Sequence, residues 1–61
     1  MPIVRIDLLE GRTEEQKRKI VEGICKVLME EGNAKKDAIT ITFHELTTDN
    51  LGKGDKLFKD L

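Results

Sequence analysis

The stretch PIVRIDLL, residues 2–9, decides how this chain begins to fold. Apolar and charged side chains alternate along it, which is the period-two pattern of a half-buried β-strand. Ile3 and Leu9 are exceptions, because they place apolar side chains near the two ends of the polar face. We therefore expect a second layer, such as another subunit, to cover that face. The alternating apolar side chains are Val4, Ile6 and Leu8.

A helix is predicted over residues 14–31, directly after the turn that follows the strand. Thr13 and Gln16 have the spacing of a capping box, in which each side chain satisfies a free backbone N–H. Gly32 and Asn33 are residues that tolerate the left-handed conformation and are expected to end the helix. The apolar stripe expected to face a sheet consists of Ile20, Ile24, Val27 and Leu28, with Val21 on its flank.

A second strand is predicted in AITITFHEL, residues 38–46, where apolar and polar side chains again alternate. Strand, helix and strand joined by short connections make a βαβ unit with parallel strands, within the α/β (α+β) class. Two strands and one helix cannot close a core, so we expect oligomerisation to complete the sheet. The whole chain, residues 1–61, is expected to be a single domain. The apolar face of this strand carries Ile39, Ile41 and Phe43.

The last segment, TTDNLGKGDKLFKDL, occupies residues 47–61. Gly52 and Gly54 predict a turn or a small hairpin. Leu57, Phe58 and Leu61 then follow with little core to join. We expect this segment to pack on a neighbouring subunit.

Composition excludes several classes of protein. A chain of 61 residues buries too little surface to be stable without support, and one cysteine and one histidine supply neither a disulfide framework nor a zinc set. The 11 basic and 12 acidic residues are scattered, and there are two aromatic residues, so we expect neither a nucleic-acid nor a membrane partner. No apolar run is long enough for a transmembrane helix or signal peptide, so a cytoplasmic location is expected.

Pro2 is a candidate catalytic residue. Removal of Met1 would expose its secondary amine, a base that no internal residue can supply. Burial or a nearby cation lowers the pKa of such an amine, which would make it a free base at neutral pH. The position alone says little, because proline is also tolerated as the first residue of a strand.

Arg12 is a candidate for binding a carboxylate, since its planar guanidinium matches two carboxylate oxygens. A solvated loop arginine is the simpler alternative. The extended strand separates Pro2 from Leu9 by about 23 Å, which one arginine side chain cannot span. Antiparallel pairing of this strand with its copy would bring Pro2 near the partner's Arg12 loop, so a site that uses both residues is expected between subunits.

Three other motifs are interpreted as structural. Cys25 is expected to be a small core side chain, because no histidine neighbours it in the sequence. His44 and Glu45 point to opposite faces of a strand and do not converge on a metal. The Gly-Lys-Gly run at residues 52–54 is too short for a phosphate-binding loop. We expect no metal and no cofactor.

PIVRIDLLEGRTEEQK, the helix, the second strand and the LGKGD turn together resemble the 4-oxalocrotonate tautomerase family over essentially the full chain. The resemblance implies a βαβ subunit that assembles into dimers and usually a hexamer, as a trimer of dimers. It also implies that Pro2 is the general base and that Arg12 binds a substrate carboxylate.

Two positions depart from the family pattern. Thr40 stands where well-studied members have a second arginine that binds substrate and polarises its carbonyl or enol oxygen. Leu51 stands where they have a phenylalanine that lines the pocket. Both residues are candidate pocket residues, and Lys35, Lys36 or His44 are the cations available to replace the missing charge.

The sequence therefore predicts a cofactor-independent tautomerase, an isomerase that transfers a proton between enol and keto forms of small 2-hydroxy-dienoate or 2-keto carboxylates, such as 2-hydroxymuconate. Two alternatives stay open. One is hydration-type dehalogenation, in which a protonated Pro2 serves as acid. The other is a non-catalytic oligomeric binding module, in which Thr40 and Leu51 mark a lost pocket.

Overall fold

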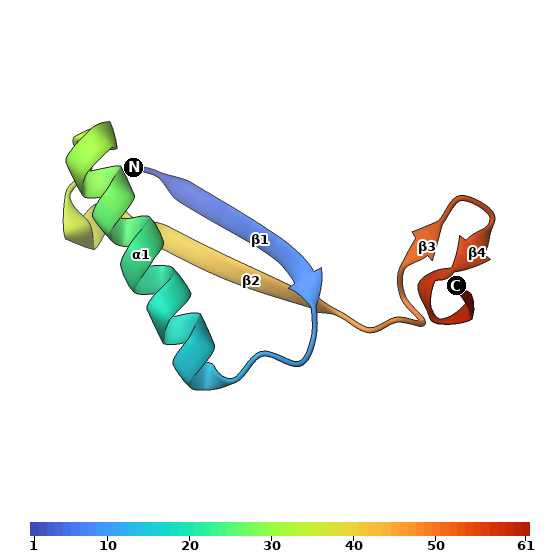
Figure 1. The fold of residues 1–61 in the computed structure, drawn as a ribbon. Helices are drawn as coiled ribbons and strands as arrows, with labels where there is room; N and C mark the ends of the chain where they lie inside the picture. The colour runs from blue at the N-terminus through green and yellow to red at the C-terminus, as the bar shows by residue number, and fades with distance from the viewer.

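The computed structural model describes residues 1–61. Strand, helix and strand follow one another and a small hairpin comes last (Figure 1), so the predicted βαβ unit with a C-terminal hairpin is confirmed. The strands and the helix are β1 (Ile3–Leu9), α1 (Glu14–Gly32), β2 (Thr40–Leu46), β3 (Gly52–Lys53) and β4 (Lys56–Leu57). Short 3-10 helices occupy Lys36–Ala38 and Phe58–Asp60.

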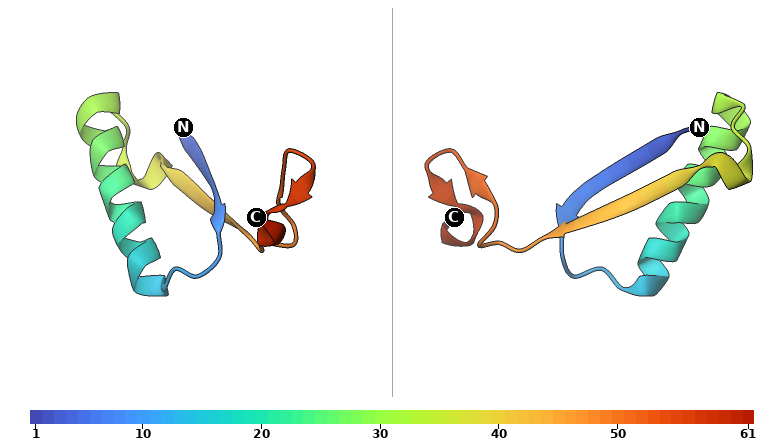
Figure 2. Two further views of the ribbon diagram at one scale, coloured as in Figure 1. Left: turned by 45° about the vertical axis from the view of Figure 1, so that its right-hand side comes forward. Right: turned by 180° about the vertical axis from the view of Figure 1, so that it is seen from behind.

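β1 and β2 form a parallel two-stranded sheet, with Ile3 beside Thr40 at one end and Leu9 beside Leu46 at the other. α1 lies on one face of this sheet and leaves the other face open (Figure 2). The face toward α1 carries Val4, Ile6, Leu8, Ile41, Phe43 and Glu45. The open face carries Ile3, Arg5, Asp7, Leu9, Thr40, Thr42, His44 and Leu46.

The ends of α1 are fixed by local hydrogen bonds. The Thr13 hydroxyl accepts from the backbone N–H of Gln16 at 3.1 Å, and the backbone N–H of Thr13 donates to the Gln16 side-chain oxygen at 2.9 Å. This is the predicted capping box. At the other end Asn33 adopts the left-handed conformation with φ 54°, and its N–H donates to the Leu28 carbonyl. Asn33 rather than Gly32 therefore ends the helix, one residue later than predicted.

The side of α1 that faces the sheet is narrower than the sequence pattern predicted. Ile20, Ile24 and Leu28 are half-buried against the sheet. Val27 is 57% exposed, so the prediction that it faces the sheet is wrong. At about 100° per residue, Val27 lies about 60° around the helix axis from Ile24, at the edge of the apolar stripe. The two-stranded sheet is too narrow to cover this edge of the helix.

The chain has no closed core. None of its 61 residues is buried, and its accessible surface is 4968 Å². A compact protein of this mass exposes roughly 4,000 Å². The radius of gyration is 14.8 Å, compared with about 10.5 Å for a compact chain of this length. An isolated chain in this conformation leaves apolar surface in water, which association would remove.

The capping box gives a direct test of the helix start. We expect Thr13→Ala to lower the free energy of unfolding by about 1 kcal/mol, because the N–H of Gln16 loses its acceptor. Urea unfolding at one fixed protein concentration measures the change. Thr13→Ser keeps the hydroxyl and is the matched control, so an equal loss in both variants would contradict this role of the hydroxyl.

The missing core gives a second test. If association supplies the buried surface, apparent stability will increase by about 1.4 kcal/mol per mole of dimer for each tenfold increase in protein concentration. Urea unfolding followed by circular dichroism, repeated over a hundredfold range of concentration, measures this shift. A midpoint that does not change with concentration would show that the chain is stable as a monomer.

Candidate active site

Pro2 lies at the start of β1 and is half-buried. Its carbonyl accepts a hydrogen bond from the backbone N–H of Thr40 at 3.0 Å. This bond ties the first residues of β1 to the start of β2, so Thr40 lies at the same end of the sheet as Pro2. Both belong to the predicted pocket, and parallel strand pairing is what brings them together.

Arg12 lies at the opposite end of the sheet, in the loop between β1 and α1 (Figure 1). The preceding Gly11 has φ +125°, a conformation that favours glycine, and this residue lets the chain turn after the strand. The Arg12 guanidinium is exposed and donates to the carbonyl of Leu9 at 3.1 Å. Its side chain is thus held against its own loop by one hydrogen bond.

The structure does not bring Pro2 and Arg12 together within one chain. The 7 residues of β1 lie between them, and an extended strand of that length is roughly 23 Å long. The outer edge of β1 has no partner strand, because the sheet consists of β1 and β2 alone.

Leu51 lies beyond the end of β2, between that strand and β3. It is half-buried, and its carbonyl accepts from the N–H of Phe58 at 2.7 Å. A second bond, from the N–H of Lys59 to the carbonyl of Thr48, closes the same segment. Leu51 therefore lies at the end of the molecule where Arg12 lies, away from Pro2 and Thr40.

The other candidate cations lie in two places. Lys35 and Lys36 precede β2, at the Pro2 end of the sheet. His44 is exposed on the open face beside Asp7, and Asp7 forms an ion pair with Arg5 at 3.2 Å. His44 is therefore farther from Pro2 along the sheet than the two lysines are.

His44 and Glu45 point to opposite faces, as predicted. Glu45 forms an ion pair with Lys17 of α1. No group of three or more His, Cys, Asp and Glu side chains lies close enough together to hold a metal ion. None of the helices has the length and apolar character needed to cross a membrane.

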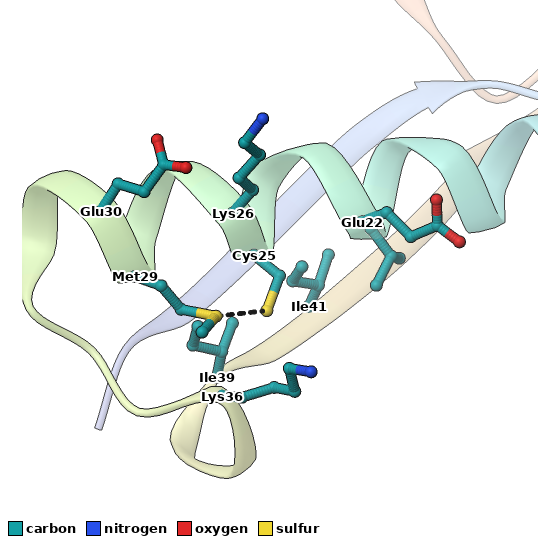
Figure 3. Close-up of a pocket in the computed structure, with 9 residues that line it drawn as sticks. Glu22, Cys25, Lys26, Met29, Glu30, Lys36, Ile39 and Ile41 are labelled. Carbon is teal, nitrogen blue, oxygen red and sulfur yellow. Dashed lines mark hydrogen bonds between the residues drawn. The ribbon is translucent and has the colours of Figure 1, made fainter.

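A groove that the sequence analysis missed runs between α1 and β2. Its volume is about 600 Å³, and its floor is apolar while charged side chains form its rim (Figure 3). We call it the β2 groove. This side of the helix carries Val21, Cys25 and Met29, which are spaced four residues apart. That spacing is the feature of the sequence that could have predicted the groove. The lining residues are Val21, Glu22, Cys25, Lys26, Met29, Glu30, Lys36, Ile39 and Ile41.

Cys25 is half-buried in the β2 groove and forms no disulfide. Its thiol lies 3.7 Å from the sulfur of Met29, one turn further along α1 (Figure 3). Cys25 lies beside apolar residues of the β2 groove, and its interpretation as a core side chain stays a prediction, because no residue of the isolated chain is fully buried.

Comparison with known proteins gives a consistent match. A family model described as tautomerase enzyme matches residues 2–61. A 2-hydroxymuconate tautomerase from Bacillus subtilis is 34% identical over 61 residues, which is 100% of this chain and 98% of the relative.

Solved structures match as well. A homologue of 4-oxalocrotonate tautomerase is 33% identical, covers 98% of both chains and superposes with a TM-score of 0.90. A structure analysed for trans-3-chloroacrylic acid dehalogenase activity is 28% identical, with a TM-score of 0.78. That match covers 87% of this chain and 100% of the other.

Proposed function

Because the chain belongs to the tautomerase family, we propose that it is a cofactor-independent isomerase that transfers a proton between enol and keto forms of small carboxylates. The substrates are 2-hydroxy-dienoates such as 2-hydroxymuconate, or 2-keto acids. The observation that carries this proposal is the family match over residues 2–61, which includes Pro2 and Arg12. The 2-hydroxymuconate tautomerase of similar length supports the substrate class.

Pro2 is the proposed base. Removal of Met1 turns the amide nitrogen of Pro2 into a secondary amine that can take up a proton. In the reaction the O–H bond of the dienol breaks, the double bonds shift, and a C–H bond forms as the ketone appears. One amine can accept the first proton and donate the second, so the transfer needs no other acid or base.

Arg12 is the proposed carboxylate ligand. Its guanidinium would exchange its bond to the Leu9 carbonyl for a bidentate contact with the substrate. Holding the carboxylate keeps the reacting carbon within reach of the amine. This positioning lowers the activation barrier, because the substrate has already lost its freedom to move and rotate. Since the whole length of β1, roughly 23 Å, separates Pro2 from the loop that carries Arg12 in the same chain, the proposed arginine comes from another copy.

The open edge of β1 supports a specific way to assemble this site. If β1 pairs antiparallel with β1 of a second copy, the start of each strand lies beside the end of the other. Pro2 of one copy then lies near the Leu9 to Arg12 segment of its partner, and the two-fold symmetry makes two equivalent sites. We propose this dimer as the catalytic unit and a hexamer, a trimer of such dimers, as the complete assembly.

Thr40 and Leu51 are proposed to line the pocket. Thr40 carries no charge that can stabilise an enolate, so the developing negative charge depends on Arg12 and on any lysine that reaches the pocket. Leu51 fills less volume than an aromatic side chain would. We therefore propose slower turnover of 2-hydroxymuconate than in relatives that carry both an arginine and a phenylalanine at these positions.

Dehalogenation by addition of water is the second candidate function. The structural likeness to a chain with trans-3-chloroacrylic acid dehalogenase activity favours it. That reaction requires protonated Pro2 as an acid, whereas tautomerisation requires the neutral amine. The profile of kcat/KM against pH separates the two: it rises as the amine loses its proton if Pro2 is a base, and it falls over the same range if Pro2 is an acid.

The first test replaces the base. With Met1 removed from both proteins, Pro2→Ala should lower kcat/KM for ketonisation of 2-hydroxymuconate by about a hundredfold or more, which is typical for the loss of a general base. Ultraviolet absorbance follows the reaction, and intact mass confirms the processing. No activity in correctly processed wild type would instead favour a non-catalytic binding module, as would retention of Met1 in the native protein.

The second test asks whether each site uses two chains. Pro2→Ala and Arg12→Ala should each be nearly inactive alone. When the two variants are unfolded and refolded together, each mixed dimer regains one complete site, which restores about a quarter of wild-type activity per chain for random pairing.

The control for this mixing experiment is Arg18→Ala, which removes an exposed arginine of α1 and should leave activity unchanged. Refolding each variant alone shows how much activity the procedure itself recovers. Mixed samples that stay as inactive as the separate variants, while circular dichroism shows refolded helix, would mean that the two residues act within one chain or not at all.

A further inference from the structure

The free edge of β1 presents the backbone groups of its odd-numbered residues. On the inner edge, the Pro2 carbonyl accepts from the N–H of Thr40 in β2. At the other end of the strand, the Glu10 N–H donates to the Leu46 carbonyl. Because the backbone groups of alternate residues point to the same side of a strand, all even-numbered residues face β2. The residues with N–H and C=O groups at the free edge are therefore Ile3, Arg5, Asp7 and Leu9.

These backbone groups limit how two β1 strands can pair antiparallel about a two-fold axis. Residues that exchange hydrogen bonds lie directly opposite each other, so odd-numbered residues must face odd-numbered residues and the axis must pass through a residue. An axis at Ile6 pairs all 7 residues of β1. An axis at Arg5 leaves residues 8–9 unpaired, and an axis at Asp7 leaves residues 3–4 unpaired. Full pairing therefore favours the axis at Ile6.

The charges on the open face of the sheet favour the same register. Arg5 and Asp7 share this face, where their side chains form an ion pair at 3.2 Å and are 64% and 50% exposed. With the axis at Ile6, Arg5 lies directly opposite Asp7 of the second copy, and Asp7 lies opposite Arg5. An axis at Arg5 places two guanidinium groups opposite each other, and an axis at Asp7 places two carboxylates opposite each other. Like charges directly opposite destabilise a pair of strands.

The apolar side chains of β1 also match in this register. An axis at Ile6 places Ile3 opposite Leu9 on the open face, and Val4 opposite Leu8 on the face toward α1. Ile3 is 68% exposed within one chain and gains an apolar neighbour from the second copy. An axis one residue to either side places an apolar side chain of the open face opposite a charged one. Both kinds of side chain therefore select one register.

We propose that Arg5 and Asp7 of two copies form a closed cluster of ion pairs around the two-fold axis, and that this cluster sets the register in which the β1 strands pair. Each guanidinium lies between the carboxylate of its own chain, which it already contacts, and that of the second copy. The occupant of the open edge is thus a second copy of this chain. The cluster rests on the β1 dimer of the proposed function and adds what specifies it.

The cluster acts on the choice of register more than on the strength of association. Exposed ion pairs contribute little net stability. Specificity, however, is a difference between the free energies of the correct and the incorrect pairing, and opposed like charges raise the free energy of the incorrect one. Reversing one charge of each chain removes this discrimination, because the correct register then carries the repulsion.

The register decides which part of the second copy lies beside Pro2. With the axis at Ile6, Pro2 lies opposite Glu10 of the second copy, where that chain has just left its strand. Arg12 follows in the loop. Moving the axis by one residue shifts this loop by two residues, about 7 Å, relative to Pro2. Since a misplacement of about 1 Å already lowers catalytic rates, Arg5 and Asp7 are proposed positioning residues for the shared site.

A disulfide on the axis tests the register. Residue 6 faces itself only when the axis passes through it, and even-numbered residues form the close pairs, with Cα atoms about 4.5 Å apart, which a disulfide can bridge. In a Cys25→Ala chain and a glutathione buffer, Ile6→Cys should form an interchain disulfide in about tenfold higher yield than the control Val4→Cys. Equal yields would overturn the register. If Pro2→Ala and Arg12→Ala still restore activity to each other, the shared site stands without it.

A second measurement tests the charges. Arg5→Asp and Asp7→Arg are each combined with Ile6→Cys and Cys25→Ala. Either variant alone surrounds the axis with like charges, whereas one chain of each kind restores the opposite pairs. The two are refolded together in the same buffer, in which disulfide exchange lets the pairs equilibrate, and intact mass counts the linked pairs. About 90% should be mixed, compared with about half for random pairing, if each variant pairs tenfold more weakly with itself.

Arg18→Asp and Glu14→Arg are the matched controls for the charge test. They reverse the same kinds of charge in an exposed ion pair of α1 and change the net charge of the chain equally. In the same cysteine background, their linked pairs should remain about half mixed. Random pairing of the β1 variants, or an equal excess of mixed pairs in the α1 variants, would overturn the role of the cluster. The disulfide at residue 6 would still report the β1 dimer in either case.

Discussion

The structure depends on one constraint: two strands and a single helix cannot enclose a side chain. None of the 61 residues is buried, although α1 is capped at both ends and the strands are paired. Apolar side chains remain on the open face of the sheet, on both flanks of α1 and in the C-terminal hairpin segment, residues 51–61. Exposure of each of these surfaces to water is unfavourable. The hydrophobic effect that stabilises the fold must therefore act largely between chains. We infer that folding and association of this protein are one process.

The same constraint determines where the proposed chemistry can occur. Parallel pairing places Pro2 beside Thr40 at one end of the sheet, while the Arg12 loop and the C-terminal hairpin segment both leave from the other end. The proposed base and the proposed carboxylate ligand are separated by the whole length of β1. They can act on one small molecule only if β1 of a second copy runs antiparallel to β1 of the first. The proposed activity is thus a property of the assembly. Contacts that join the copies are as important to it as the residues that touch the substrate.

Local features of the sequence predicted the elements well, because their causes are local. The Thr13 hydroxyl and the Gln16 amide, three residues apart, favour a helix start through neighbouring backbone groups, and alternating side chains define the faces of a strand. The sequence pattern failed for Val27, because burial depends on how far the sheet extends beneath the helix. It also missed the β2 groove, whose two walls come from α1 and β2 and take their shape from the packing angle between them.

By itself, the sequence determined the order of the elements and the two faces of each strand, and its length led us to expect a partner. It also offered Pro2 and Arg12 as candidates by their chemical type, while the roles proposed for them rest on the resemblance to the family. Only the tertiary structure decided that Thr40 bonds to Pro2, that Leu51 lies at the opposite end, and that the C-terminal hairpin segment stands free while a groove beside β2 stays open. These relations join residues far apart in the sequence, and they are set by strand register and by the placement of α1 on one face of the sheet.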